Sequence, residues 1–174
     1  MTVTFYGQVS PMYLGYDDDA KSYGNLTDNG NSNCRIGLTL MQPAGSGLTF
    51  GMVLEAALGG PQCSGFAQVS DPIWIWQKTD IRKAEISLGG HFGTLFLGQG
   101  SMATDSVAAR DLSGTALAGY VNRPDTAGSY SLRRRDGDLS GFTIGDVFKD
   151  YNGSTRKQIR YDTPGWNGLS LRGA

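Results

Sequence analysis

The feature that most constrains this chain is a set of segments of about ten residues in which apolar and polar side chains alternate, separated by glycine-rich turns. Asn33 to Gln42 shows the pattern most clearly. Its apolar set is Cys34, Ile36, Leu38 and Leu40, and its polar set is Asn33, Arg35, Gly37 and Thr39. Because alternate residues of a strand face opposite sides, the segment predicts a strand with one apolar and one polar face. When tilted, such a strand is long enough to cross a bilayer.

Composition narrows the class of protein further. The 174 residues are a usual length for one domain, and the net charge of −1 gives no basic surface for nucleic acid, so no nucleic-acid partner is expected. No run approaches the roughly 18 apolar residues of a membrane helix, which excludes a helical membrane protein. The 26 glycines and the lack of helical heptads favour an all-β chain with antiparallel strands.

The connections between the expected strands alternate in length. The strands are expected at Thr2–Tyr16, Asn33–Gln42, Leu48–Leu58, Ile73–Leu88, Thr94–Gln99 and Thr155–Asp162, with a further one beginning at Leu169 and running to Ala174. Residues 100–154 show no clear strand apart from short pieces at Thr115–Val121 and Gly141–Phe148, and Pro11 indicates an edge or bulge in the first strand. Long connections alternating with short turns are typical of outer-membrane barrels.

The N-terminus and the cysteines bear on the compartment. Met1 leads straight into a strand-like segment with no signal peptide, so either a leader was removed and replaced by an initiator Met, or the protein is not exported. Cys34 and Cys63 are the only cysteines. They form either a disulfide between a strand end and the following outer loop, which an oxidising compartment permits, or two free thiols.

Several segments, in order along the whole chain, resemble the general porins of Gram-negative bacteria, especially those of alphaproteobacteria. The matching segments are Thr4–Val9, Arg82–Gly90, His91–Gln99, Arg160–Pro164 and Gly168–Leu171. The resemblance implies a transmembrane β-barrel of about sixteen strands in the bacterial outer membrane. It also implies a water-filled channel for passive diffusion of ions and small polar solutes, surrounded by lipid and assembled as a homotrimer. No enzymatic activity is expected.

The chain departs from the family pattern in two ways. About seven strands are expected here, and bacterial single-chain barrels have even strand numbers so that the sheet closes. Family members end in an aromatic residue, whereas this chain ends at Arg172-Gly173-Ala174 in mid-strand. We therefore interpret residues 1–174 as one N-terminal portion of a porin barrel domain, with residues 100–154 as its long constriction-loop region.

In the porin family the third loop folds into the barrel and narrows the pore, with loop carboxylates facing arginines of the wall. The resemblance implies Asp105 and Asp111 on the loop. Alternation places four cationic residues on the polar face of the wall, namely Arg35, Lys83, Arg160 and Arg172. The family motif points to Arg82 where alternation points to Lys83, and a bulge would admit both. The alternative is that all these residues are solvated strand and loop charges.

Other residues have two readings each. Trp74, Trp76, Tyr13 and Tyr16 fit an aromatic girdle at the membrane interfaces, or they pack in a core or lumen. The run Arg133–Arg135 fits either the phosphates of lipopolysaccharide or a solvated loop.

Chemistry has little support in the sequence. His91 is the only histidine, it falls in an expected turn, and neither a nucleophile elbow nor a zinc-spaced Cys/His cluster is present. No cofactor is therefore expected, with calcium on the oxygens of Asp17–Asp19 or Asp28–Asn31 as the alternative, although the spacing is not that of an EF-hand. The rival function is a soluble or surface-exposed β-sheet binding protein without channel activity, whose apolar faces would meet in a core.

Overall fold

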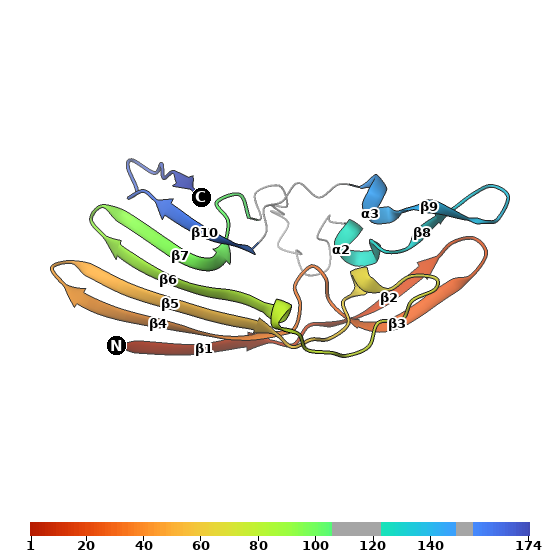
Figure 1. The fold of residues 1–174 in the computed structure, drawn as a ribbon, viewed down its shortest axis with the longest axis horizontal. Helices are drawn as coiled ribbons and strands as arrows, with labels where there is room; N and C mark the ends of the chain where they lie inside the picture. Colours follow the sequence, from red (N-terminus) through yellow and green to blue (C-terminus); the bar gives the residue numbers. More distant parts are fainter. Residues whose placement is uncertain (106–122, 149–154) are drawn as a thin grey trace.

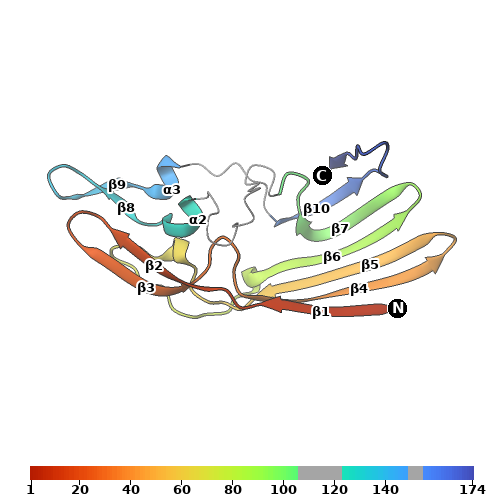
Figure 2. The ribbon, with the colours of Figure 1, turned by 180° about the vertical axis from the view of Figure 1, so that it is seen from behind.

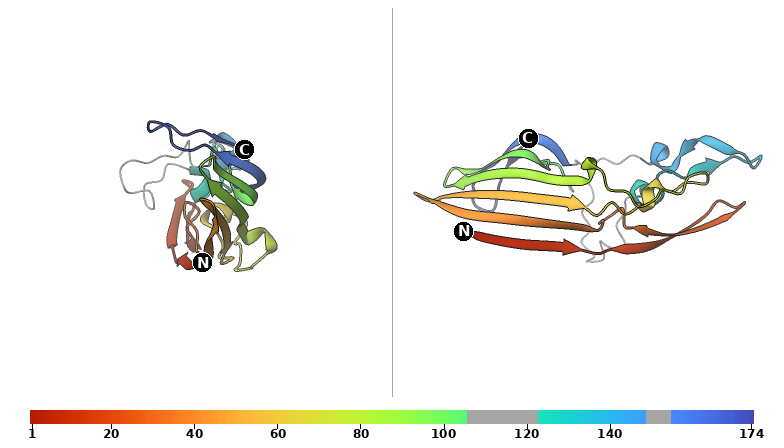
Figure 3. Two further views of the ribbon diagram at one scale, coloured as in Figure 1. Left: turned by 90° about the vertical axis from the view of Figure 1, so that its left-hand side faces the viewer. Right: turned by 60° about the horizontal axis from the view of Figure 1, so that its bottom comes forward.

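A computed structural model describes residues 1–105, 123–148 and 155–174. Its main feature is a seven-stranded antiparallel sheet in the order β1-β4-β5-β6-β7-β10-β11. Figures 1 and 2 show this sheet in one half of the molecule and two separate hairpins in the other half. In the end view of Figure 3 the strands follow an arc rather than a plane. The expected all-β class and antiparallel sheet are confirmed.

The elements alternate between the sheet and the loop region. The sheet strands are β1 (Thr2–Gln8), β4 (Arg35–Gly45), β5 (Leu48–Ala57), β6 (Ile81–Gly90), β7 (Gly93–Ser101), β10 (Thr155–Asp162) and β11 (Arg172–Gly173). The loop region holds the hairpins β2 (Pro11–Asp17) with β3 (Ser22–Asp28) and β8 (Ser131–Arg133) with β9 (Leu139–Thr143), together with the short helices η1 (Cys63–Gly65), η2 (Lys78–Asp80), α2 (Arg123–Ala127) and α3 (Ile144–Val147). Among the described residues, no helix has the length and apolar character needed to span a bilayer.

The register of the sheet gathers apolar side chains on one face. One row of directly paired residues crosses six strands and is apolar throughout: Val3, Leu40, Met52, Ile86, Leu97 and Ile159. This face is open, because Leu97 is 50% and Ile159 is 66% exposed. Within the described part of the chain, the apolar face of the sheet therefore has no second layer packed on it, unlike the core expected of a soluble β-sheet protein.

Short turns join the sheet strands at one end only. The turn between β4 and β5 uses left-handed backbone at Gly45, Ser46 and Gly47, with φ of 81°, 50° and 75°. The turn between β6 and β7 places His91 and Phe92 before Gly93, whose φ of 108° favours glycine. The long connections all begin and end at the opposite end of the sheet, so the predicted alternation of long and short connections is confirmed.

The long connections pack together into a second region, which we call the cap: residues 10–34, 58–80 and 123–148. Its core consists of Leu14, Cys63, Phe66, Ala127 and Tyr130, with Met12, Tyr16, Tyr23 and Ile144 packed against it. Tyr130 is fully buried, and its ring centroid lies 4.1 Å from that of Tyr16 and 5.6 Å from that of Tyr23. The only hydrophobic core of the described residues is thus in the cap, not in the sheet.

Several expected boundaries were wrong. The first expected strand, Thr2–Tyr16, is two strands, because Pro11 lacks an N–H donor and the chain leaves β4 after Gln8 to pair with β3. The polar stretch expected as a loop over Asp17–Ser32 therefore contains β3. The segment Ile73–Gln77 is not in the sheet, and the last strand contains only Arg172–Gly173.

Of the two short strands expected within residues 100–154, the structure describes one segment. The short segment expected at Gly141–Phe148 is the end of β9 followed by α3. The piece expected at Thr115–Val121 lies outside the described residues.

The disulfide considered for Cys34 and Cys63 is not formed, and both are buried free thiols. Each sulfur has a different partner. The Cys34 Sγ accepts a hydrogen bond from the Ser10 N–H at 3.1 Å. The Cys63 Sγ donates to the Asp125 carbonyl at 2.9 Å and accepts from the Gly30 N–H at 3.2 Å. The free-thiol alternative is the one that the structure has.

Candidate functional site

The candidate site is the polar face of the sheet, because register brings charged residues together there from strands far apart in the sequence. One row pairs Tyr6 of β1 with Gly37 of β4, Glu55 of β5 and Lys83 of β6. All four wall cations expected from the sequence belong to this face. Arg35 pairs with Gln8, Arg160 with Phe96, and Arg172 with Asp162.

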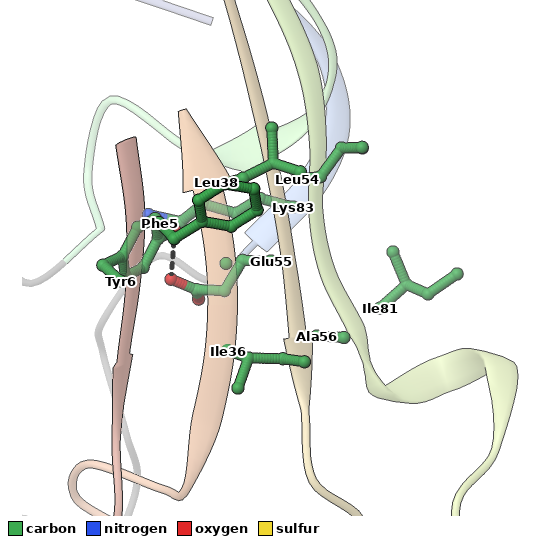
Figure 4. Close-up of a pocket in the computed structure, with 10 residues that line it drawn as sticks. Phe5, Tyr6, Ile36, Leu38, Leu54, Glu55, Ala56, Ile81 and Lys83 are labelled. Carbon is green, nitrogen blue, oxygen red and sulfur yellow. Dashed lines mark hydrogen bonds between the residues drawn. The ribbon is translucent and has the colours of Figure 1, made fainter. Parts of the chain in front are cut away.

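Glu55 is the centre of the first charged group. Its side chain is only 5% exposed, and it accepts hydrogen bonds from the Tyr6 hydroxyl at 2.8 Å and the Arg82 Nε at 2.7 Å. The Arg35 Nε lies 3.9 Å from the same carboxylate. Figure 4 shows the Tyr6–Glu55 bond as a dashed line beside Lys83. A buried carboxylate requires such partners, since an unpaired buried charge is costly.

A β-bulge explains how both Arg82 and Lys83 serve this face. Glu55 pairs with Lys83, but the next residue of β5, Ala56, pairs with Ile81, so Arg82 is the extra residue of β6. The bulge lets Arg82 reach Glu55 while Lys83 keeps its place in the polar row. Alternation and the family motif, which pointed to Lys83 and Arg82 respectively, are therefore both compatible with the structure.

Arg35 is held in place at the end of β4 nearest the cap. Its Nη2 donates to Gln8 Oε1 and to Ser32 Oγ, each at 3.3 Å. The Gln8 Nε2 also donates to Ser32 Oγ at 2.7 Å and to the Asn33 carbonyl at 2.9 Å. Arg35 thus lies where the wall meets the first long connection, and its side chain is 24% exposed.

A second charged group surrounds Asp162 of β10. The Arg160 Nε and Nη2 donate to its two carboxylate oxygens at 3.0 and 3.3 Å. The Arg172 Nε of the neighbouring strand β11 lies 3.5 Å from Asp162 Oδ2, with a side chain that is 59% exposed. Arg160 and Arg172 are therefore brought together, whereas Arg35 and Lys83 belong to the Glu55 group on other strands.

Of the two loop carboxylates expected from the sequence, the structure describes only Asp105. Asp105 lies just beyond β7 and is half-buried, in a turn where its N–H donates to the Met102 carbonyl at 3.0 Å. Asp111 lies outside the described residues. No ion pair between Asp105 and a wall cation occurs in the described ranges, so their opposition across a pore stays a prediction.

Among the described residues, no charged group of this kind lies near Glu55 on the opposite face of the sheet. That face carries an apolar groove lined by Phe5, Ile36, Leu38, Leu54, Ala56 and Ile81. These side chains are drawn in Figure 4. Phe5 is 79% and Ile36 is 58% exposed there. The sheet therefore separates an apolar surface from a charged one across the thickness of a single layer.

The remaining expected residues belong to the cap or its edge. Trp74 and Trp76 are 66% and 55% exposed, beside the end of β5, where the Trp76 Nε1 donates to the Ala57 carbonyl at 3.2 Å. Tyr13 is 71% exposed in the hairpin β2–β3, whereas Tyr16 packs on Tyr130 in the cap core. The girdle interpretation is thus wrong for Tyr16, and core packing is correct.

Arg133 is not the solvated loop residue expected. It pairs with Asp18 at 2.6 Å, and that carboxylate is only 1% exposed. The Arg133 hydrogen bond lowers the pKa of Asp18 to about 2. Asp18 also accepts from the backbone N–H groups of Ala20 and Lys21. The described residues contain no group of three or more side chains able to hold a metal ion.

Sequence reasoning did not include Glu55, Tyr6 and Glu85 among the site residues. Glu55 lies opposite Lys83 only through the register of β5 and β6, which no single segment reveals. A Cβ on Gly37 would collide with the Tyr6 ring, and a Cβ on Gly100 would collide with the Glu85 carboxylate. Glycines at alternate polar positions were the available signal, because a large side chain on a neighbouring strand can lie over them.

The chain is similar in sequence and in fold to known proteins. The family profile described as Gram-negative porin matches residues 2–174. Among solved structures, the anion-selective porin from Comamonas acidovorans is similar, with a TM-score of 0.56 and 24% identity. The match covers 97% of this chain and 44% of that porin, so the chain spans less than half the length of its relative. A search of curated protein sequences finds no match.

Proposed function

This chain belongs to the Gram-negative porin family, a family of the bacterial outer membrane, and on that premise we propose that it forms part of a channel wall. The channel is a water-filled path for passive diffusion of ions and small polar solutes. One observation carries the proposal. The sheet exposes an apolar row from Val3 to Ile159 on one face and buries Glu55 among cations on the other. Lipid suits the first face and water the second.

The proposal includes a longer barrel than these residues supply. In the described sheet, β1 and β11 each have a strand on one side only, and open edges are not tolerated in lipid. We infer that residues 1–174 are the N-terminal portion of one barrel domain of about sixteen strands. The complete protein is proposed to be a homotrimer in contact with lipid and lipopolysaccharide, without a cofactor. An intact mass near twice 18.6 kDa for the mature protein would support this, and a mass near 18.6 kDa would contradict it.

The proposed constriction lies between the polar face and the region of residues 100–154. Arg35, Lys83 and Arg172 are the wall cations carried into the proposal, together with Arg82, and Asp105 and Asp111 are the loop carboxylates. Arg160 shares the polar face, but its guanidinium is already engaged by Asp162 and by backbone. Opposed charges in a narrow water path orient polar solutes and select ions by charge.

An anion preference follows from the charges of the described wall. The cations of the polar face are Arg35, Arg82, Lys83, Arg156, Arg160 and Arg172, and its carboxylates are Glu55, Glu85 and Asp162. Because cations outnumber carboxylates, the positive potential raises the local concentration of anions.

The test is conductance of the complete protein in a planar bilayer. Stepwise ohmic conductance is expected, with a reversal potential in a potassium chloride gradient that shifts toward the chloride potential. Arg35→Gln and Arg82→Gln should each lower the anion preference. Charge reversal of Asp111 should raise it. An absence of conductance from folded protein would contradict the channel and favour the binding protein.

Lys157→Gln is the matched control for selectivity. Lys157 pairs with Gln99, which pairs with Ala84, so it lies on the apolar face of the same sheet. Its neutralisation removes the same charge from the side proposed to face the bilayer. An equal shift of reversal potential in Lys157→Gln and Arg35→Gln would show that net charge, rather than a position on the water path, sets selectivity.

A further inference from the structure

The clearest contact that the proposed channel does not explain is at the point where the chain leaves β7 for the long connection. The carbonyl oxygen of Ser101 accepts two side-chain hydrogen bonds, from Gln158 Nε2 at 2.7 Å and from Arg160 Nη1 at 2.5 Å. Both donors lie on β10, the strand that follows the long connection. The two ends of residues 100–154 are therefore joined through side chains of one wall strand as well as through the β7–β10 ladder.

Glycine makes this contact possible. Gly98 has a φ of 128°, which residues with a Cβ rarely adopt, and a Cβ there would collide with the Ala84 carbonyl. Gly100 leaves room for the Glu85 carboxylate on the same polar face. β7 bends strongly at this end, as Figure 1 shows in green, and the bend brings the Ser101 carbonyl within reach of Arg160.

The Arg160 side chain is engaged on every side. Besides Ser101, it makes the two-bond contact with Asp162, and its Cζ lies 4.0 Å from the centroid of the Phe96 ring. Its side chain is 12% exposed, against 59% for Arg172, which contacts the same carboxylate. Arginine suits this place because its planar fork donates in several fixed directions at once and stacks on an aromatic ring.

We propose that Arg160 is a positioning residue that fixes the start of the long connection to the channel wall, rather than a free charge of the water path. The inference rests on the proposed channel only for its functional meaning. Through Ser101 it sets the direction in which the chain leaves β7, and so the start of the connection that the proposed channel assigns to its constriction. Gln158 supports the same carbonyl without carrying a charge.

The test separates the effect of the positive charge of Arg160 from the effect of its hydrogen-bonding geometry, and it uses the complete protein. Arg160→Lys keeps the charge but loses the fork, and Gln158→Leu removes a neutral donor. Both are expected to alter single-channel conductance and increase open-channel fluctuations, with the reversal potential unchanged. Lys157→Arg, which keeps a charge on the apolar face of the same strand, is the matched control and should change neither. If Arg160→Lys conducts as wild type does, while Arg160→Gln shifts the reversal potential alone, Arg160 is a lumen charge and the inference is overturned.

A second readout does not depend on conductance. Trypsin has a target after Arg156, which pairs with Gly100 in the β7–β10 ladder beside Ser101, and cleavage of a paired strand requires local opening. Losing a charged hydrogen bond should make cleavage of Arg160→Lys in detergent about tenfold faster. Unchanged cleavage in both Arg160→Lys and Gln158→Leu would overturn the inference. Faster cleavage in a protein that does not conduct would support the positioning role and contradict only the channel.

Discussion

The seven-stranded sheet, which we call the wall, and the cap bury opposite kinds of side chain. In the wall, apolar Leu97 and Ile159 are exposed, while the carboxylate of Glu55 is buried among cations. In the cap, Tyr130 and Cys63 are fully buried. The same chain thus contains a sheet face that suits an apolar surrounding and a cap that buries its apolar side chains, as a fold in water does. Exposed apolar area therefore destabilises a region only if that region is surrounded by water.

The two regions also differ in what holds them together. The wall is a ladder of backbone hydrogen bonds between neighbouring strands, with polar side chains on one face. The cap joins three distant segments through side chains: Gln68 exchanges two hydrogen bonds with Ser131, and Arg133 pairs with Asp18. We expect mutations in the cap to open it without disturbing the wall, and mutations on the outer face of the wall to act in the opposite way.

The largest effect is expected from Tyr130→Ala. Removing a fully buried aromatic ring costs about 3–5 kcal/mol, which falls on the cap because Tyr16 and Tyr23 pack directly against it. Hydrogen exchange of residues 10–34 should become much faster, while exchange of β5 and β6 stays slow. Tyr13→Ala is the control, since Tyr13 is 71% exposed. Equal acceleration in β5 and β6 would break the comparison.

Leu97→Arg should destabilise the wall and leave the cap intact. Leu97 lies in the middle of β7 in the apolar row, where an arginine facing the bilayer costs about 2–4 kcal/mol. The measurement is urea unfolding of the complete protein in lipid vesicles. Thr39→Arg, on the polar face of β4, is the control and should cost far less. A similar loss in both variants would contradict the assignment of one face of the wall to lipid and the other to water.

Acid should weaken the cap through Asp18. Its pKa is about 2 in the folded protein because of Arg133, below about 3.9 for an unfolded chain. A lowered folded pKa gives stability that is complete above about pH 4 and is lost as the pH falls toward 2. The near-ultraviolet signal of the cap tyrosines should report this loss. In Asp18→Asn the pH dependence should be flatter, and an unchanged profile would exclude Asp18 as its source.

The smallest effect concerns reactivity rather than stability. Burial raises the pKa of the Cys63 thiol, and its side chain is inaccessible, so a thiol reagent should not label it in the folded protein. Labelling should appear when the cap opens in Tyr130→Ala and stay absent in Leu97→Arg. Rapid labelling in the unmodified protein would show that the cap core is open in solution.

Much of the wall could be predicted from the sequence because its rules are local. Alternation in Asn33–Gln42 and in Thr155–Asp162 identified β4 and β10 directly, and the glycine turns marked the hairpins. The placement of Arg35, Lys83, Arg160 and Arg172 on one face is what the register of the sheet shows. Alternation alone decides these directions, since a strand has a period of two.

The cap and the contacts of the site could not be predicted in this way. Ile73–Trp76 is as apolar as a strand but does not join the sheet, and the polar segment that contains β3 gave no strand signal. Pairings such as Arg133 with Asp18 join residues more than a hundred positions apart. Such contacts depend on how the loops pack against one another, and this packing cannot be predicted from a local sequence pattern. Asp111 and its constriction stay a prediction.

The extra residue in β6 has a consequence for how such a wall can change. If Arg82 were deleted, Ile81 would still face outward, and Lys83, Ala84 and Glu85 would keep their sides, because the bulge is the only irregularity in this part of the ladder. A single-codon deletion would therefore remove one positive charge without shifting the frame of the strand. At this bulge, the charge of the polar face can therefore change by one unit while the register of the sheet stays the same.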